Sequence, residues 1–310
     1  MPATRTVLRG KEREMLNTAT KYGILVAVDG SAESDAAVAW ATREAVLRHL
    51  PVTLFHAVAP VVVGWPVGQL YEEMPDWQKD NGDQVIERAR TVLAASLDGA
   101  EPPPARTVMP YADVVPTLIE ASKEASMLVV GSVGMGGLGR LLLGSVSSAV
   151  LQHAHCPVAV VRSGDDAAPG ANAPVVVGID GSPASESATA LAFDEASRRG
   201  VELVALHAWS DVGVFPVLGM HWRDRERDGE EVLAERLAGW QEQYPDVHVR
   251  RELVCDKPAR WLLEEAERAQ LVVLGSRGRG GFPGMLLGSV SSAVAHAARI
   301  PVLIASAKGL

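Results

Sequence analysis

The chain has 310 residues, and its 29 lysines and arginines against 38 aspartates and glutamates give a formal net charge of −9 at pH 7. This acidic balance argues against nucleic acid or an anionic membrane surface as a partner. The sequence has no apolar run long enough to span a membrane, and its first 22 residues lack the apolar segment of a secretory signal. Two cysteines cannot build a disulfide framework or a four-thiolate zinc site. With 47% apolar residues, we expect a folded, cytoplasmic protein.

An internal repeat divides the chain into two copies of one unit. LLLGSVSSAV at 141–150 and MLLGSVSSAV at 285–294 agree at nine of ten positions, 144 residues apart. ILVAVDGS at 24–31 corresponds to VVVGIDGS at 175–182, where the spacing is 151 residues. The two spacings indicate one insertion of seven residues between the early and late parts of the unit. Two copies of this length predict tandem domains and exclude a solenoid.

The repeat also predicts the domain boundaries. A segment rich in Gly, Ala, Pro and Asp separates the two copies and has no apolar period, which is typical of a linker. The residues before the first copy do not repeat, and we interpret them as an extension. The predicted organisation is an extension at 1–22, a first domain at 23–162, a linker at 163–173 and a second domain at 174–310.

Each copy has the same order of predicted elements. In copy one they are strands at 23–28, 52–58, 106–109, 127–130 and 157–161, alternating with helices at 34–49, 83–96, 114–125 and 145–154. In copy two the strands are 175–179, 201–209, 247–254, 271–274 and 301–305, and the helices are 186–199, 230–244, 259–269 and 289–298. The strands are apolar at consecutive positions, so both faces are buried. The sequence therefore predicts two α/β domains of Rossmann-like type, each a five-stranded parallel sheet with helices on both faces.

A glycine-rich loop follows the fourth strand of each copy with the spacing Gly-x2-Gly-x9-Gly-Ser. The last glycine, Gly144 or Gly288, directly precedes a predicted helix, whose first N–H groups and dipole favour an anion. The serines of that first turn add hydroxyl donors. In an open parallel sheet, ligands bind at the carboxyl ends of the strands where the strand order reverses. The loop therefore predicts a phosphate site.

The end of the first strand supplies the other half of the predicted crevice. Asp29 and Asp180 are suited to hydrogen bonds with a ribose or a base. Two residues earlier, Ala27 and Gly178 lie on the same face and are small, which leaves room for a ligand ring.

The glycine loop after the fourth strand and the aspartate at the end of the first strand occur in both copies. With these two motifs the chain resembles the ATP-binding class of the universal stress proteins, over residues 22–162 and 174–307. The resemblance implies ATP in each domain, with or without Mg²⁺, and little hydrolysis. It places base and ribose contacts at Ala27, Asp29, the main chain of Ala57, Gly178, Asp180 and Ala208. It places phosphate contacts at Gly131, Gly134, Gly144, Ser145, Val146, Ser147, Gly275, Gly278, Gly288, Ser289, Val290 and Ser291. We add the remaining loop candidates Ser132, Val133, Gly136, Gly137, Ser276, Gly280 and Gly281, the cations Arg140, Arg277 and Arg279, and Asp211, whose alternative is a solvated loop acid.

The leading functional hypothesis is a nucleotide-dependent regulator of the stress response or of dormancy-type growth control. It would form a homodimer, take up to two ATP per chain and act on an unknown protein partner. No nucleophile–base pair accompanies the aspartates, so we expect no enzyme, although slow ATP hydrolysis stays open. The alternatives are a slow ATPase or phosphotransferase, and an interaction module that takes no nucleotide.

The remaining motifs do not indicate a further binding or catalytic site. The glycine loop matches a dinucleotide fingerprint in copy one only, because Pro283 interrupts it in copy two, and no P-loop is present. His153 and Cys156 have no counterparts in copy two, so a metal site is not expected. His56 and His207 end buried strands and are predicted to be satisfied core histidines.

Overall fold

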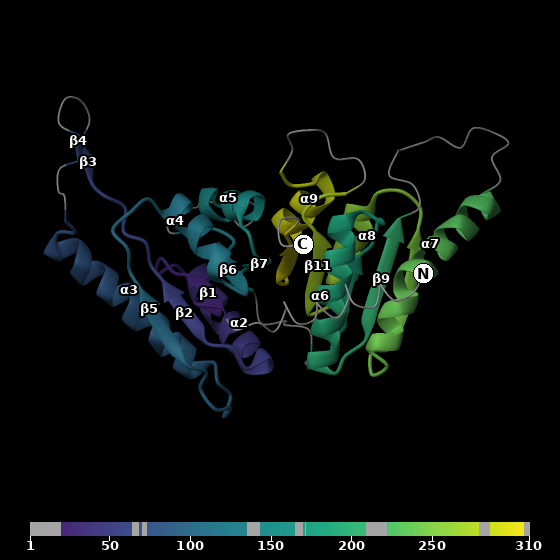
Figure 1. Cartoon of the computed structure of the whole chain (residues 1–310), viewed down its shortest axis with the longest axis horizontal. Helices are drawn as coiled ribbons and strands as arrows, with labels where there is room; N and C mark the ends of the chain where they lie inside the picture. Colours follow the sequence, from purple (N-terminus) through teal and green to yellow (C-terminus); the bar gives the residue numbers. More distant parts are fainter. Residues whose placement is uncertain are drawn as a thin grey trace. The chain divides into compact units, whose positions relative to one another are not determined.

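The computed structural model describes residues 20–63, 68–69, 73–134, 143–164, 170, 172–208, 222–278 and 286–306. These residues form two compact units, which divide between Ser163 and Gly164 (Figure 1). They are the N-terminal unit and the C-terminal unit below.

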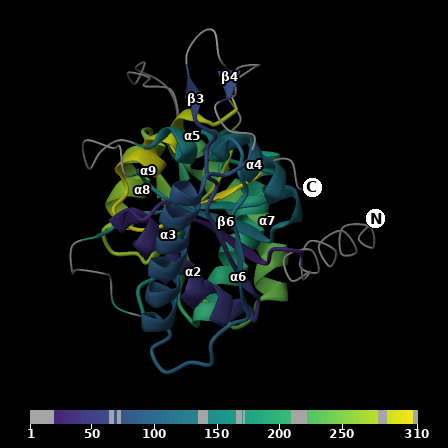
Figure 2. The same cartoon turned by 90° about the vertical axis from the view of Figure 1, so that its left-hand side faces the viewer.

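The N-terminal unit contains a parallel sheet of five strands in the order β5-β2-β1-β6-β7. The strands are β1 (Ile24–Ala27), β2 (Val52–Phe55), β5 (Ala105–Val108), β6 (Met127–Gly131) and β7 (Val158–Val161). The helices are α2 (Ala32–Arg48), α3 (Asp76–Ala95), α4 (Val114–Ala121), the 3-10 turn η1 (Ser122–Glu124) and α5 (Ser145–His153). Helices α2 and α3 pack together, as do α4 and α5, and Figure 2 shows α2 and α3 in front of the strands.

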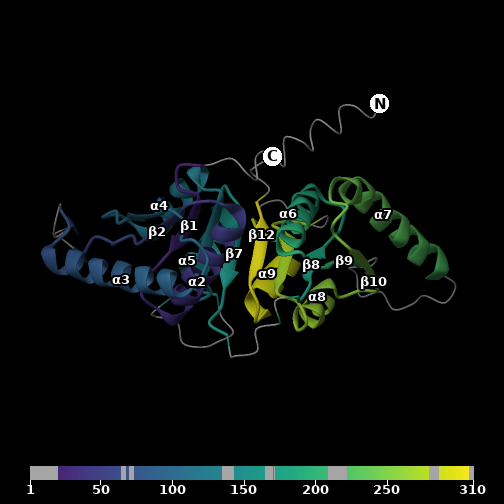
Figure 3. The same ribbon diagram turned by 90° about the horizontal axis from the view of Figure 1, so that it is seen from below.

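The C-terminal unit repeats this architecture in the order β10-β9-β8-β11-β12, again all parallel. Its strands are β8 (Val175–Gly178), β9 (Leu203–Ala208), β10 (Val249–Val254), β11 (Leu271–Gly275) and β12 (Val302–Ala305). Its helices are α6 (Pro183–Arg199), α7 (Trp222–Gln243), α8 (Pro258–Ala266) and α9 (Ser289–Ala297). Figure 3 shows α6 and α7 on one side of this sheet and α8 and α9 on the other.

The central strands carry the core of each unit. Ile24, Leu25 and Val26 of β1 are fully buried, as are Leu128 and Val129 of β6. Such strands are covered on both faces, so the predicted parallel sheet with two helical layers is confirmed. Strand order reverses between β1 and β6, and between β8 and β11, which creates a crevice at the carboxyl ends of these strands.

The Asp-Gly-Ser motif forms the turn from the first strand to the first helix of each unit. Gly30 and Gly181 have φ of +86° and +78°, a conformation that glycine adopts without strain. Ser31 then caps α2 by accepting a hydrogen bond from Ser34 N at 3.2 Å, and Ser182 caps α6 in the same way.

The second helix of each unit begins earlier than its sequence pattern indicates. Helix α3 starts at Asp76 rather than residue 83, and α7 starts at Trp222 rather than residue 230. The added turns are rich in charged residues and lack an apolar stripe, so the helical period is not visible there. A short antiparallel pair, β3 (Val62–Val63) and β4 (Gly68–Gln69), lies between β2 and α3, where the sequence pattern predicts neither a strand nor a helix.

Two tryptophans, Trp65 and Trp77, lie between β2 and the second turn of α3. Trp77 at the start of α3 is 59% exposed and does not pack in the core of its unit. Trp65 lies outside the described residues. Trp240 of α7, by contrast, is buried against Phe193, with ring centroids 6.1 Å apart.

Candidate functional site

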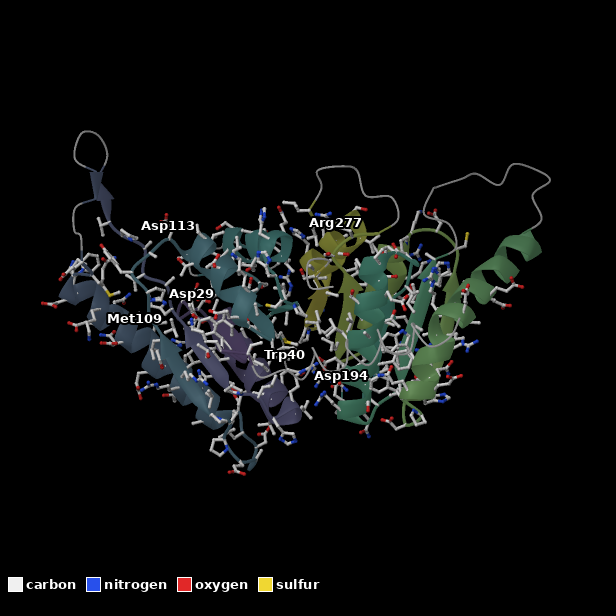
Figure 4. All side chains as sticks on the ribbon, in the orientation of Figure 1. Asp29, Trp40, Met109, Asp113, Asp194 and Arg277 are labelled. Carbon is white, nitrogen blue, oxygen red and sulfur yellow. The ribbon has the colours of Figure 1, made fainter. Side chains whose placement is uncertain are left out.

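The predicted aspartates lie at the crevice, just beyond the first strand of each unit. Asp29 follows β1, and Figure 4 labels it together with Met109 and Asp113, which follow the parallel strand β5. Asp180 takes the same place after β8. Across the crevice, the glycine loops begin where β6 and β11 end, at Gly131 and Gly275.

Each aspartate is held by the turn that follows it. Asp29 Oδ1 accepts hydrogen bonds from Ser31 N at 3.0 Å and Ser31 Oγ at 2.6 Å. Asp180 Oδ1 accepts from Ser182 N at 2.9 Å, whereas the Ser182 hydroxyl donates to the carbonyl of Arg277 at 3.1 Å. The carboxylates are therefore oriented before any ligand arrives.

The other carboxylate oxygen faces the second glycine of the loop. A β-carbon added to Gly134 would lie 2.6 Å from Asp29 Oδ2, and one added to Gly278 would lie 2.5 Å from Asp180 Oδ2. Real β-carbons essentially never approach this closely, so glycine alone allows the loop backbone to lie against the acid. The first and second halves of the predicted site are thus in contact in both units.

Each glycine loop is closed by a backbone hydrogen bond. Gly144 N donates to Ser132 O at 2.7 Å, and Gly288 N donates to Ser276 O at 2.8 Å. The side chains of Ser132 and Ser276 are buried. The closure places the start of α5 or α9 beside the residues that immediately follow β6 or β11.

Helices α5 and α9 begin without a side-chain cap, in contrast to α2 and α6. Their N-cap residues are Gly144 and Gly288, and neither has a side chain that accepts a hydrogen bond. The first turn of a helix has no internal partner for its N–H groups. These groups, with the positive end of the helix dipole, therefore stay available to an anion. They belong to Ser145, Val146, Ser147, Ser289, Val290 and Ser291.

Some predicted donors have another role. The hydroxyls of Ser147 and Ser291 donate to Gly131 O and Gly275 O, both at 2.6 Å, and both side chains are buried. They tie the helix to the end of the strand, so only their N–H groups can face a ligand. Ser145 and Ser289 are exposed.

The first glycines of the loops are explained by packing. A β-carbon at Gly131 would lie 2.8 Å from the β-carbon of Glu33 in α2, and one at Gly275 would lie 2.6 Å from the carbonyl carbon of Ala184 in α6. Their lack of a side chain allows strand and helix to approach closely, independently of any ligand.

The main chain of Ala57 follows β2 at the carboxyl end of the sheet. Val28 N donates to Phe55 O at 3.0 Å, so the next bond of a regular parallel ladder would run from Ala57 N to Val28 O. Instead, His56 Nδ1 lies 2.8 Å from Val28 O. The C-terminal unit is the same: Ile179 N donates to Leu206 O at 2.8 Å, and His207 Nδ1 lies 2.6 Å from Ile179 O, ahead of Ala208.

The space beside Gly178 is filled, whereas it was predicted to leave room for a ligand ring. A β-carbon there would lie 2.6 Å from Leu274 Cδ2 and 3.4 Å from Leu262 Cδ1, so leucine side chains occupy the room that was reserved for a ligand ring. In the N-terminal unit the corresponding pair is Ala27 and Val130, which are adjacent in register because Val26 pairs with Val129. The two units fill this position differently.

The predicted loop cations are only partly described. Arg277 is exposed, and its Nε donates to Leu286 O at 3.5 Å, whereas Val133 takes this place in the N-terminal unit. The candidates that lie outside the described residues are Gly136, Gly137, Arg140, Asp211, Arg279, Gly280 and Gly281. Sequence reasoning missed the serine caps; their signal was the Ser that follows Asp-Gly in both copies.

Within the described ranges, no group of three or more His, Cys, Asp or Glu side chains is arranged to hold a metal ion. Burial raises the pKa of the Cys156 thiol to about 12, which suits a packed side chain rather than a ligand. The two strand-end histidines are both hydrogen-bonded; His207 is buried as predicted, whereas His56 is only partly buried.

Comparison with known proteins decides the family. The model of the universal stress protein family matches residues 23–162 and 172–306. The chain belongs to this family. A universal stress protein of Mycolicibacterium smegmatis is 57% identical over 94% of this chain and 99% of its own length. The universal stress protein Rv2005c of Mycobacterium tuberculosis is 51% identical over 92% of this chain and 97% of its own.

The fold of this universal stress protein also has a solved counterpart. The crystal structure of a universal stress protein from Archaeoglobus fulgidus matches it with a TM-score of 0.68 and 21% identity, over 92% of this chain and 98% of the other. The predicted family and the tandem α/β architecture are confirmed. In the part of the chain that the structure describes, no helix has both the length and the apolar character to span a membrane.

Proposed function

We propose that each unit of this universal stress protein binds one adenine nucleotide, ATP, and that occupancy regulates recognition by a protein partner. The observation that carries the proposal is the uncapped start of α5 and of α9, which lies beside a glycine loop packed on an oriented aspartate. The same arrangement occurs in both units. Its parts fit a nucleotide, because the N–H groups at the helix start suit phosphates and the nearby carboxylate suits a sugar hydroxyl.

Charge supports a direction for the bound nucleotide. Phosphates would be repelled by Asp29 or Asp180 and attracted by the free N–H groups of the helix start. The carboxylates are hydrogen-bond acceptors, which suits the ribose hydroxyls. The base then extends toward the strand end at Ala57 or Ala208, whose main-chain groups can pair with the edge of adenine.

The proposed role is binding with little or no turnover. The carboxylate of the crevice is hydrogen-bonded to the turn that follows it, whereas phosphoryl transfer needs a positioned base and a charge clamp. A Mg²⁺ ion that accompanies ATP would add charge neutralisation at the phosphates. A ligand that binds one conformation better shifts the population toward it, which is how occupancy becomes a signal.

Calorimetric titration of the full chain with ATP tests the proposal. We expect saturable binding that approaches two sites per chain, with Asp29→Asn and Asp180→Asn each weakening one of them. If ATP gave no heat of binding and denatured fresh protein released no nucleotide, the proposal would be contradicted and the interaction module favoured. Repeated turnover in a phosphate-release assay, lost in both variants, would instead favour an ATPase.

A further inference from the structure

The imidazole of a strand-end histidine replaces a backbone donor in both sheets. A carbonyl oxygen only accepts hydrogen bonds, so the contact of 2.8 Å between His56 Nδ1 and Val28 O requires the proton on Nδ1. Val28 O belongs to the peptide group whose nitrogen is that of Asp29. The contact of 2.6 Å between His207 Nδ1 and Ile179 O holds the peptide group of Asp180 in the same way.

This contact changes the hydrogen bonding of the next residue. In a regular ladder, Val28 O would accept from the N–H of Ala57, which follows His56. The described structure has no backbone hydrogen bond between Ala57 N and Val28 O, although the preceding rung from Val28 N to Phe55 O is intact at 3.0 Å. The imidazole thus leaves a main-chain donor available at the end of β2, beside the crevice.

The surroundings of the two histidine rings are known from their contacts and burial. A β-carbon on Gly82 of α3 would lie 3.2 Å from His56 Cδ2, so the ring packs against α3. His207 is only 4% exposed. We therefore assign the influence of these rings on a ligand to the backbone that each ring holds.

We propose that His56 and His207 are positioning residues that set base recognition in the two sites. Each imidazole donates a hydrogen bond to the carbonyl oxygen of the residue before the aspartate. The N–H of Ala57 or Ala208 therefore remains free to donate to a nucleobase. The same bond fixes the peptide group that carries the sugar-binding acid. This inference rests on the proposed nucleotide site and names the device that makes it selective for a nucleotide over a bare polyphosphate.

Amide hydrogen exchange at Ala57 tests the backbone step without any ligand. In the full wild-type chain this amide should exchange quickly, and ATP should protect it. His56→Leu removes the donor at similar volume, so Val28 O becomes free to accept from Ala57 and the amide should be protected even without ATP. His56→Asn retains an N–H donor close to the position of Nδ1 and should behave as wild type. Slow exchange of Ala57 in the ligand-free wild-type chain would overturn the proposal.

Binding measurements test selectivity, in a chain that carries Asp180→Asn so that the N-terminal site is observed. His56→Leu should weaken ATP at least tenfold and leave inorganic tripolyphosphate unchanged, because the start of α5 is untouched. His56→Asn should stay within threefold of the parent. Should the leucine variant not fold, His56→Gln, whose amide lies one carbon further out, should show the same loss. Equal weakening of both ligands, or none, would overturn the positioning role, whereas a wild-type chain that binds no ATP would refute the proposed function itself.

Discussion

Gly134 lies directly against the carboxylate of Asp29, because a β-carbon at this glycine would be 2.6 Å from Asp29 Oδ2. The C-terminal unit has the same relationship between Gly278 and Asp180, at 2.5 Å. The loop and the acid are therefore one structural element, and a change to either moves the other.

Gly134→Ala should weaken ATP binding in the N-terminal unit by at least tenfold, since the new methyl group displaces either the loop or the acid. Titration calorimetry should then report one tight site per chain. Gly164→Ala is the matched control, because a β-carbon there meets nothing within 4 Å. Two unaltered sites in the Gly134 variant would contradict the arrangement.

Gly288→Ala tests whether this glycine is needed to leave room for the ligand or to allow packing of the protein. A β-carbon at Gly288 would have its nearest contacts at 3.6 Å, an ordinary distance, so the fold should tolerate it with only a small loss from the poorer N-cap. We expect thermal unfolding close to wild type and tripolyphosphate binding reduced in the C-terminal unit, because the methyl group stands at the helix start. Full binding by a well-folded variant would place the phosphates elsewhere.

Gly178→Ala should destabilise the C-terminal unit by about 1–3 kcal/mol, because the added methyl group would meet Leu274 at 2.6 Å. Adding Leu274→Val recreates the Ala27–Val130 pair of the other unit and should recover much of the loss. Urea unfolding of the two single variants and the double variant measures the coupling. Simple additivity of the single effects would show that the two positions do not share one space.

The Cys156 thiol should be unreactive in the folded protein. Burial raises its pKa to about 12, whereas Cys255 is exposed. Iodoacetamide at pH 8 should modify Cys255 alone, and both cysteines only after denaturation. Two modified cysteines in the native chain would show that the N-terminal unit opens readily.

The same shift predicts a pH effect on stability. The folded pKa of Cys156 is raised from 9.0, so its stabilising contribution is complete below about pH 9 and is lost as the pH rises toward 12. The stability advantage of wild type over Cys156→Ala should fall by about 1.4 kcal/mol per pH unit above pH 9. A constant difference between pH 8 and pH 10.5 in denaturant titrations would contradict this.

The parts of the fold that depend on continuous burial were predictable from the sequence. Strand β1 was expected at 23–28 and is Ile24–Ala27, because its first three residues are fully buried. The first turns of α3 and α7 were not predictable, since their charged residues follow no apolar period. Helices of this kind extend past the sheet, where packing no longer imposes a pattern.

Residue types at the site were easier to predict than their roles. Asp29, Gly134 and Gly144 meet at the crevice where the motif placed them. The Ser147 hydroxyl turns inward to Gly131 O, which depends on a rotamer that no sequence pattern encodes. The hydrogen bond from His56 to Val28 O could not be predicted for a related reason. It replaces a backbone hydrogen bond between neighbouring strands, and only the three-dimensional structure shows that this backbone bond is absent.

The glycine N-caps of α5 and α9 have a consequence for the living cell. A serine at these positions would satisfy the helix internally, as Ser31 does for α2. If the proposed nucleotide takes that place, the melting temperature of each unit should depend on the nucleotide concentration. A ligand at one hundred times its dissociation constant adds about 2.7 kcal/mol, so on the proposed function a fall in cellular ATP would lower the stability of the folded protein.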